Sequence, residues 1–285
     1  METHKVVLVT GAGSGFGKCI ALALAKEGWL VYASMRAPQG RNRARAQALL
    51  AACPERIRVV ELDVGDDASA AGGVARVIQE AGRIDVLVNN AGIMFQGVSE
   101  AYDMAQARDI METNFFSAVR MDRLVLPQMR RQRGGVLLHI TSIAGSIVFP
   151  FAGLYSASKM ATEGLAESYR YELRQFGIDS LVIQPCPYPT ALLDSQQAPA
   201  DAERLAAYGE QGRLPEQRIA STKAWHQKDK APDPDEVAQS VCQLLAMPFG
   251  ERPFRSVAGT LDFGTSRLND VRAEVQAGVA GAFGF

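Results

Sequence analysis

The sequence has few of the residues that build disulfide frameworks and metal sites. Its 285 residues include four cysteines and three histidines, and neither type forms a cluster. The cysteines lack C-x-x-C spacing, so free thiols in a reducing compartment fit better than disulfides. We expect no metal site. His139 lies inside an apolar stretch, where a buried structural role is the simpler interpretation.

An excess of one charge and long apolar runs are also lacking. The formal net charge is −1, which gives no indication of a nucleic-acid partner. No apolar run reaches the roughly 18 residues that a membrane-spanning helix needs. Residues 1–5 lead straight into an apolar stretch rather than forming a secretory signal. We therefore expect a cytoplasmic protein that binds neither nucleic acid nor membrane.

What the chain does have is a regular alternation of short apolar stretches and helical patterns. The predicted strands are 5–10, 29–34, 58–62, 85–88, 136–140 and 178–184, with a last one at 254–258. The alternation continues unbroken past the middle of the chain, which favours one domain over residues 1–285. The sequence therefore predicts an α/β fold with a Rossmann-like, doubly wound parallel sheet.

A glycine-rich turn follows the first strand. Gly11, Gly15 and Gly17 come after Thr10 and before a helical pattern that starts at Ile20. Such a turn lets the backbone approach a pyrophosphate, which the positive end of the helix attracts. The common G-x-G-x-x-G spacing is not matched, so an ordinary glycine-rich turn remains an alternative.

The end of the second strand lacks the acidic residue that usually binds the ribose of NAD. No Asp or Glu occurs between positions 28 and 54, and Arg36 follows the strand instead. A guanidinium suits a 2′-phosphate, so this segment favours NADP over NAD. Arg41, Arg43 and Arg45 are interpreted as a solvated helix start.

Tyr155 and Lys159 are four residues apart in a predicted helix over 154–176. This spacing places both on one helix face. A nearby cation lowers the pKa of a phenol, ordinarily ~10, so the pair could donate a proton near neutrality. Ser142 follows the fifth strand, where its hydroxyl could hold a substrate oxygen. A solvated helix face is the alternative for the pair alone.

Amide and small residues occur where a ligand would meet the sheet. Asn89 to Gly92 follow the fourth strand, and such residues suit backbone contacts to a ligand. Asn114 interrupts a long helical pattern over 103–131, where bonding to its own helix backbone is the alternative. Residues 185–190 are rich in proline, and 191–232 form a polar insertion that we interpret as a substrate loop or lid.

These motifs together resemble the short-chain dehydrogenase/reductase family along nearly the whole chain. The matching residues are Thr10, Gly11, Gly15, Gly17, Asp63, Val64, Asn89, Asn90, Ala91, Gly92, Asn114, Ser142, Tyr155 and Lys159. Residues 31–36 look like the NADP-using branch that includes retinol and 17β-hydroxysteroid dehydrogenases. The resemblance implies hydride transfer between NADP(H) and a ketone, aldehyde or secondary alcohol, by a homodimer or homotetramer. A non-catalytic NADP-binding redox sensor on the same fold is the alternative.

The resemblance also implies roles for individual residues. Tyr155 would be the general acid and base, Ser142 would hydrogen-bond the substrate, and Asn114 would hold a water in a proton relay. Lys159 would lower the pKa of Tyr155 and hold the nicotinamide ribose. Asp63 would bind the adenine ring. With Tyr155 and Lys159, the residues implied to contact the cofactor are Thr10, Gly11, Ser14, Gly15, Phe16, Gly17, Arg36, Asp63, Val64, Asn90, Ala91, Gly92, Pro185 and Thr190.

The chain departs from the resembled pattern at Cys186, where the family usually has glycine. A thiol there either narrows the substrate pocket or packs into the protein as a small apolar group. The expected pocket is apolar, which favours an apolar carbonyl substrate, although core packing is an alternative role for each wall residue. Besides Ser142 and Cys186, the expected walls are Met94, Phe95, Ile147, Val148, Phe149, Leu192, Leu193 and Trp225.

Overall fold

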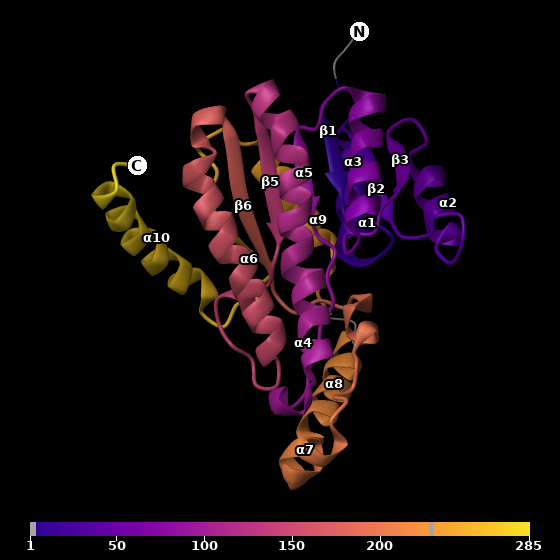
Figure 1. Ribbon diagram of the computed structural model, residues 1–285, viewed down its shortest axis with the longest axis vertical. Helices are drawn as coiled ribbons and strands as arrows, with labels where there is room; N and C mark the ends of the chain where they lie inside the picture. Colours follow the sequence, from indigo (N-terminus) through magenta and orange to yellow (C-terminus); the bar gives the residue numbers. More distant parts are fainter. Residues whose placement is uncertain (1–3, 228–230) are drawn as a thin grey trace.

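The computed structural model describes residues 4–227 and 231–285, which form a sheet flanked by helices (Figure 1). The described strands are all parallel and make one seven-stranded sheet in the order β3-β2-β1-β4-β5-β6-β7. They are β1 (Val6–Val9), β2 (Leu30–Met35), β3 (Ile57–Glu61), β4 (Val86–Asn89), β5 (Gly135–Ile140), β6 (Ile178–Pro185) and β7 (Arg255–Ala258). The predicted doubly wound parallel sheet is confirmed. The strand order reverses between β1 and β4, which is where such sheets bind ligands.

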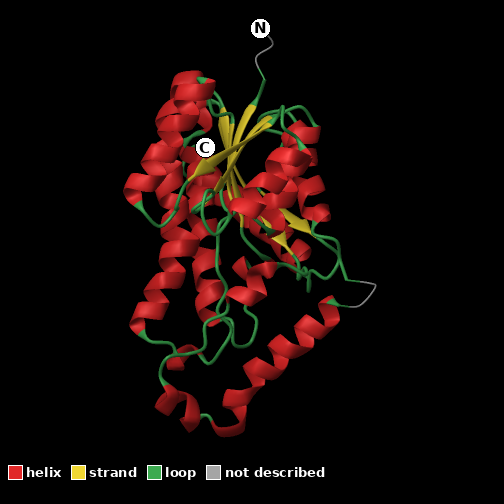
Figure 2. Cartoon of the chain, turned by 90° about the vertical axis from the view of Figure 1, so that its right-hand side faces the viewer, coloured by secondary structure: helices red, strands yellow, loops and turns green. Residues whose placement is uncertain are grey.

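Helices cover both faces of the sheet (Figure 2). The strands are apolar on both sides, because alternate residues of β1 enter two different core clusters. One cluster contains residues of α1 (Gly15–Lys26), α2 (Arg43–Ala52) and α9 (Asp235–Ala246). The other contains residues of α3 (Asp67–Ala81), α5 (Ser117–Gln132) and α6 (Gly153–Glu172). Short 3₁₀ turns occur at η1 (Ser99–Ala101), η3 (Ile143–Gly145) and η4 (Arg174–Phe176).

The helical pattern predicted over 103–131 is not one regular helix. It consists of α4 (Met104–Met111), a π turn η2 (Glu112–Phe116) and then α5. Asp103 starts the segment with a capping box, in which its side chain accepts from the Gln106 backbone N–H. The π turn contains Asn114, whose side chain is turned out of the helix to bond another segment. π turns of this kind are frequent at functional sites.

The insertion after β6 forms its own helical layer beyond the end of the sheet, at the bottom of Figure 1. It contains η5 (Ala191–Ser195), α7 (Ala202–Ala207), η6 (Gly209–Arg213) and α8 (Leu214–His226). Residues 228–230 of the predicted 191–232 insertion lie outside the described residues, as do residues 1–3 of the predicted lead into β1. The C-terminal tail forms α10 (Thr265–Ala282). None of the described helices is both long and apolar enough to cross a membrane.

Candidate active site

A cavity of about 1080 Å³ opens at the carboxyl ends of the strands. It is lined by the segments that follow β1 to β6, by α6 and by part of the insertion. Most residues predicted to contact a cofactor line it: Gly11, Ser14, Gly15, Phe16, Arg36, Asp63, Val64, Asn90, Ala91, Gly92, Tyr155, Lys159, Pro185 and Thr190. The structure therefore brings together residues from across the chain at one edge of the sheet.

Two predicted residues, Thr10 and Gly17, support the cavity wall from behind. The Thr10 hydroxyl accepts hydrogen bonds from the backbone N–H groups of Asn90 at 2.9 Å and Ala91 at 3.1 Å. It thereby joins the turns after β1 and β4. A Cβ on Gly17 would collide with the Asn90 side chain and the carbonyl oxygen of Gly11. Glycine is therefore required there by close packing of the helix on the turn.

The glycine turn itself has the backbone that only glycine adopts readily. Gly11 has φ +65° and Gly15 has φ +52°. Ser14 precedes α1 without a side-chain cap on the helix start. The first N–H groups of α1 therefore lack an intrahelical partner at a point where the turn borders the cavity. This arrangement fits a phosphate group.

The far end of the cavity carries two arginines. Arg36 follows β2, as predicted, and Arg45 also lines the cavity. A Cβ on Gly13 would lie 3.6 Å from Arg45 Cδ, so this side chain lies against the glycine turn. Asn42 connects the pair, because its amide donates to the Arg36 carbonyl at 2.7 Å and its Oδ1 accepts from Arg45 at 3.3 Å. Arg45 is exposed in the first turn of α2, as interpreted, and it also borders the cavity, which was not predicted. The sequence feature that indicates such a site is the absence of Asp and Glu between positions 28 and 54, a segment that contains Arg45.

Tyr155 and Lys159 line the same cavity from α6, each with 6% of its surface exposed. Lys159 Nζ donates to the carbonyl oxygen of Ile140 at 3.2 Å and lies 5.7 Å from the centre of the Tyr155 ring. Ser142 follows the same strand end and lines the cavity. The alternative of a solvated helix face is thus wrong for this pair.

The predicted lowering of the Tyr155 pKa is not found. Burial raises the pKa of Tyr155 to about 12, and a hydrogen bond with Ser142 opposes that rise only in part. Burial lowers the pKa of Lys159 to about 8, while the nearby Glu163 carboxylate acts in the opposite direction. Near neutral pH, the site therefore holds a neutral phenol and a protonated lysine. Desolvation of the phenol is thus the dominant cause of the Tyr155 shift.

Asn114 connects the turn after β4 with α6. Its Oδ1 accepts from the Ile93 backbone N–H at 2.8 Å, and its Nδ2 donates to the Ile93 carbonyl and to Ser158 Oγ, both at 2.9 Å. The alternative, bonding to its own helix, is therefore wrong. A Cβ on Gly92 would lie 3.1 Å from Asn114 Oδ1 and 3.5 Å from Lys159 Nζ, so these side chains meet behind Gly92.

The substrate end of the cavity is partly as predicted. Met94, Ser142, Phe149, Cys186, Leu192 and Leu193 line it, whereas Phe95, Ile147, Val148 and Trp225 are not among its lining residues. Phe95 is instead buried in a core cluster, where its ring stacks on Tyr102. Val148 has 62% of its surface exposed. The sequence pattern identifies these four residues as apolar but does not show whether their side chains point into the cavity.

The lining residues that the sequence analysis did not identify include three large side chains from the end of the chain and the insertion. Phe263 follows β7 and makes an edge-to-face contact with Phe149 at 5.4 Å between ring centres. Arg218 and His226 reach the cavity from α8. Phe263 lies in a turn between β7 and α10, and α8 has no apolar face, so hydrophobic periodicity could not locate these residues.

Cys186 borders the cavity and also belongs to the largest core cluster. Only 6% of its surface is exposed. A Cβ on Gly259 would lie 2.8 Å from Cys186 Cβ, so the side chain packs beside the segment after β7. Cys186 does not have a positive φ, and a glycine is therefore not required by the backbone at this position.

Known proteins with similar sequences indicate the family to which this chain belongs. The short chain dehydrogenase family model matches residues 5–201. A 3-ketodihydrosphingosine reductase of Bacteroides thetaiotaomicron is 32% identical over 90% of this chain and 88% of its own. Human 17-beta-hydroxysteroid dehydrogenase type 1 is 38% identical over 66% of this chain and 58% of its own.

Solved structures show the same relationship. A short-chain dehydrogenase from Streptomyces avermitilis has a TM-score of 0.79 and 32% identity, covering 99% of this chain and 98% of its own. The actinorhodin polyketide ketoreductase with NADPH has a TM-score of 0.74 and 28% identity, covering 90% of this chain and 96% of its own. From the matched family model, the relatives and the shared fold, we conclude that this chain belongs to the short-chain dehydrogenase/reductase family of oxidoreductases.

Proposed function

We propose that this protein is an NADP(H)-dependent reductase of ketones or aldehydes, or in reverse a dehydrogenase of secondary alcohols. The observation that carries the proposal is one continuous cavity with Tyr155, Lys159 and Ser142 at one end and Arg36 and Arg45 at the other. The first group suits proton transfer to a carbonyl oxygen. The two arginines suit a 2′-phosphate.

The residues present fit the dinucleotide. Gly11 and Gly15 give a turn over which backbone can approach a pyrophosphate, and the start of α1 supplies N–H groups. Asp63, with Val64, would hold the adenine end, and the turn from Asn90 to Gly92 would face the nicotinamide end. Lys159 would hold the nicotinamide ribose. When bound, the nicotinamide supplies or accepts the hydride.

The chain's own residues would manage the proton. Ser142 holds the carbonyl oxygen by a hydrogen bond, and Tyr155 donates its phenolic proton to that oxygen. Because Tyr155 is neutral near pH 7, it is in the protonation state that a reduction requires. The Lys159 ammonium then stabilises the phenolate that remains. Asn114 would support reprotonation through a relay water.

An apolar carbonyl compound is the substrate class we propose. The apolar side chains at the substrate end are Met94, Phe149, Leu192, Leu193 and Phe263. The named relatives include enzymes of sphingoid and steroid compounds. The insertion, 191–232, would act as the lid, because Arg218 and His226 on α8 border the cavity. We further propose a cytoplasmic homodimer or homotetramer.

The test is a turnover assay with purified protein. NADPH and NADH oxidation would be followed by absorbance with matched apolar and polar ketones and aldehydes, and alcohol oxidation with NADP⁺. We expect turnover with NADPH and apolar carbonyl compounds. NADPH binding by fluorescence without turnover on any compound would instead favour a redox sensor and contradict the proposal.

A further inference from the structure

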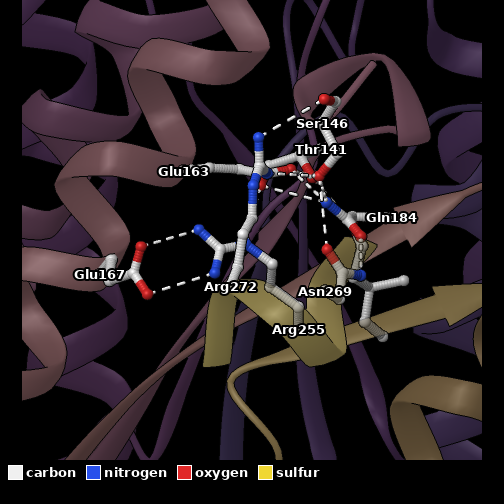
Figure 3. Close-up of polar contacts among 9 residues, drawn as sticks. Thr141, Ser146, Glu163, Glu167, Gln184, Arg255, Asn269 and Arg272 are labelled. Carbon is white, nitrogen blue, oxygen red and sulfur yellow. Dashed lines mark hydrogen bonds and ion pairs between the residues drawn. The ribbon is translucent and has the colours of Figure 1, made fainter. Parts of the chain in front are cut away.

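A buried ion pair lies one helical turn beyond Lys159 on α6 (Figure 3). Glu163 pairs with Arg255 of β7, with Oε2 and Nε 3.1 Å apart and side-chain exposures of 3% and 9%. Arg255 also pairs with Glu167, the next turn along, at 2.8 Å. Breaking a buried pair from one side is costly, so its location beside the catalytic residues needs an explanation.

The Glu163 carboxylate accepts hydrogen bonds from the ends of two further strands. The Thr141 hydroxyl, directly after β5, donates to Oε1 at 2.9 Å. The Gln184 amide of β6 donates to Oε1 at 2.8 Å and to Oε2 at 3.1 Å. A Cβ on Gly145 would collide with the same carboxylate. Glu163 is therefore fitted against the turn that begins at Ser142.

Three successive turns of α6 hold the segment 140–142. Tyr155 hydrogen-bonds with Ser142. Lys159 donates to the carbonyl oxygen at the end of β5. Glu163 accepts from Thr141, the residue between that carbonyl and Ser142. The catalytic helix and the strand end that carries Ser142 are thus joined by three contacts, of which only Glu163 provides a fixed negative charge.

The C-terminal helix α10 closes this network from outside (Figure 3). Asn269 donates to Gln184 Oε1 at 2.7 Å, and Arg272 donates to Ser146 Oγ at 2.7 Å. Gln184 also donates to Ser146 Oγ at 2.7 Å. Both ends of the turn that follows β5 are therefore held, at Thr141 by Glu163 and at Ser146 by Gln184 and α10.

We propose that Glu163 is a positioning residue, which fixes Ser142 relative to Tyr155 and Lys159, and that Asn269 and Arg272 complete this support. The inference rests on the proposed function for its kinetic readouts. Glu163 itself would not touch substrate, because it bonds only to Thr141, Gln184 and Arg255 among the described residues.

The first test is Glu163→Gln, which keeps the size and removes the charge. In this variant, the side-chain NH₂ group replaces one carboxylate oxygen, so it faces hydrogen-bond donors from which it cannot accept. Since misplacement of about 1 Å can cost 100-fold in rate, we expect kcat to fall between about 10-fold and 100-fold. NADPH affinity should be unchanged. The matched control is Glu167→Gln, which removes an ion pair with the same arginine but no contact with Thr141 or Gln184.

The second readout is the pH profile of kcat/KM. The titratable groups that face Lys159 are Tyr155 and Glu163 on α6 and His139 on β5. The Glu163 network also contains Arg255 of β7 and Arg272 of α10. Loss of the carboxylate removes a charge that favours the lysine ammonium. The alkaline limb should therefore move to lower pH in Glu163→Gln and return in Glu163→Asp. A purely structural role would lower the amount of active enzyme and leave the limb in place.

The third readout needs neither substrate nor cofactor. The backbone N–H groups of Ala144 and Gly145 bond to Ser142 Oγ and O. Their hydrogen exchange should be faster in Glu163→Gln than in the parent, and unchanged in Glu167→Gln. If Glu163→Gln does not fold, Arg272→Met gives the same comparison from α10, with a smaller loss of kcat. Turnover by no carbonyl would refute the proposed function alone, whereas unchanged exchange in these variants would refute the positioning role.

Discussion

His139 Nε2 and Asp122 Oδ2 lie 3.9 Å apart in the interior, and neither atom has a hydrogen-bond partner among the described residues. Asn89 joins the two side chains, because its Nδ2 donates to Asp122 Oδ1 at 2.7 Å and lies 3.3 Å from His139 Nδ1. Burial raises the pKa of Asp122 to about 8 and lowers that of His139 to about 3. At neutral pH, this cluster therefore holds a protonated acid beside a neutral imidazole.

The cluster predicts a loss of stability as pH rises. Because the folded pKa of Asp122 is raised, the native state binds the extra proton between about pH 4 and pH 8, and the free energy of unfolding falls over that window. The folded pKa of His139 is lowered, so its own effect lies below about pH 6.5. Measurements between pH 6.5 and 8 therefore exclude the effect of His139, and comparison with a variant at Asp122 separates Asp122 from Lys159, whose folded pKa of about 8 acts in the opposite direction.

Asp122→Asn should remove this dependence. We expect the parent to lose about 1–2 kcal/mol between pH 6.5 and 8 and the variant to lose much less. Urea unfolding at several pH values makes the measurement, with the exposed Asp109→Asn as control. A parent curve that is flat across this range would contradict the account.

Tyr155→Phe tests the proton donor. It keeps the ring between α6 and the cavity and removes only the hydroxyl. General acid catalysis contributes about 10²–10⁴-fold, so kcat should fall by at least 10²-fold while NADPH binding is retained. Tyr171→Phe on the same helix, away from the cavity, is the control. Turnover of Tyr155→Phe within about tenfold of the parent would remove Tyr155 from the mechanism.

Arg36→Ala tests the choice of cofactor. Loss of a charged hydrogen-bond partner costs about 1.5–3 kcal/mol, so the Kd of NADPH should rise at least tenfold and that of NADH only slightly. Arg45→Ala should act in the same direction, since its side chain lies against the glycine turn and lines the cavity. Arg43→Ala, on the same helix but not lining the cavity, should leave both affinities unchanged. A parent that binds NADH more tightly than NADPH would refute NADP preference.

Local sequence patterns were sufficient to predict the sheet and the glycine turn. Buried parallel strands give continuous apolar runs, and the predicted strand over 178–184 is β6 (Ile178–Pro185) in the structure. The pair Tyr155 and Lys159 could be located because one helix turn fixes their relation. The spacing of the pair does not show how deeply Tyr155 is buried, and burial raises its pKa where a lowering was expected.

Features that depend on packing between distant segments could not be predicted. Glu163 looks like a polar helix residue, and its role depends on Gln184, Arg255 and α10, which no periodicity brings together. Phe95 and Val148 are equally apolar, yet one is buried in the core and the other faces solvent. Arg45 lines the cavity only because α2 begins beside the glycine turn.

Cys186 gives a test of how the cavity wall sets selectivity. Its side chain borders the cavity on one side and packs beside Gly259 on the other, while its backbone N–H donates to the Ala258 carbonyl at 2.8 Å. Pro185 and Pro187 limit how far this segment can withdraw. Cys186→Gly would open space at the wall and remove a core contact.

Two separate effects are expected from Cys186→Gly. The free energy of unfolding should fall by about 1 kcal/mol, because a flexible glycine replaces a packed side chain whose backbone is unstrained. One methylene in a pocket discriminates substrates by about 1–3 kcal/mol, so the ratio of kcat/KM for a bulky and a small ketone should rise about tenfold. Cys242→Ala, a half-buried cysteine on α9 away from the cavity, should change stability alone. If Cys186→Gly also changes stability alone and leaves the kcat/KM ratio and the product chirality unchanged, the Cys186 side chain contributes to core packing and not to selectivity.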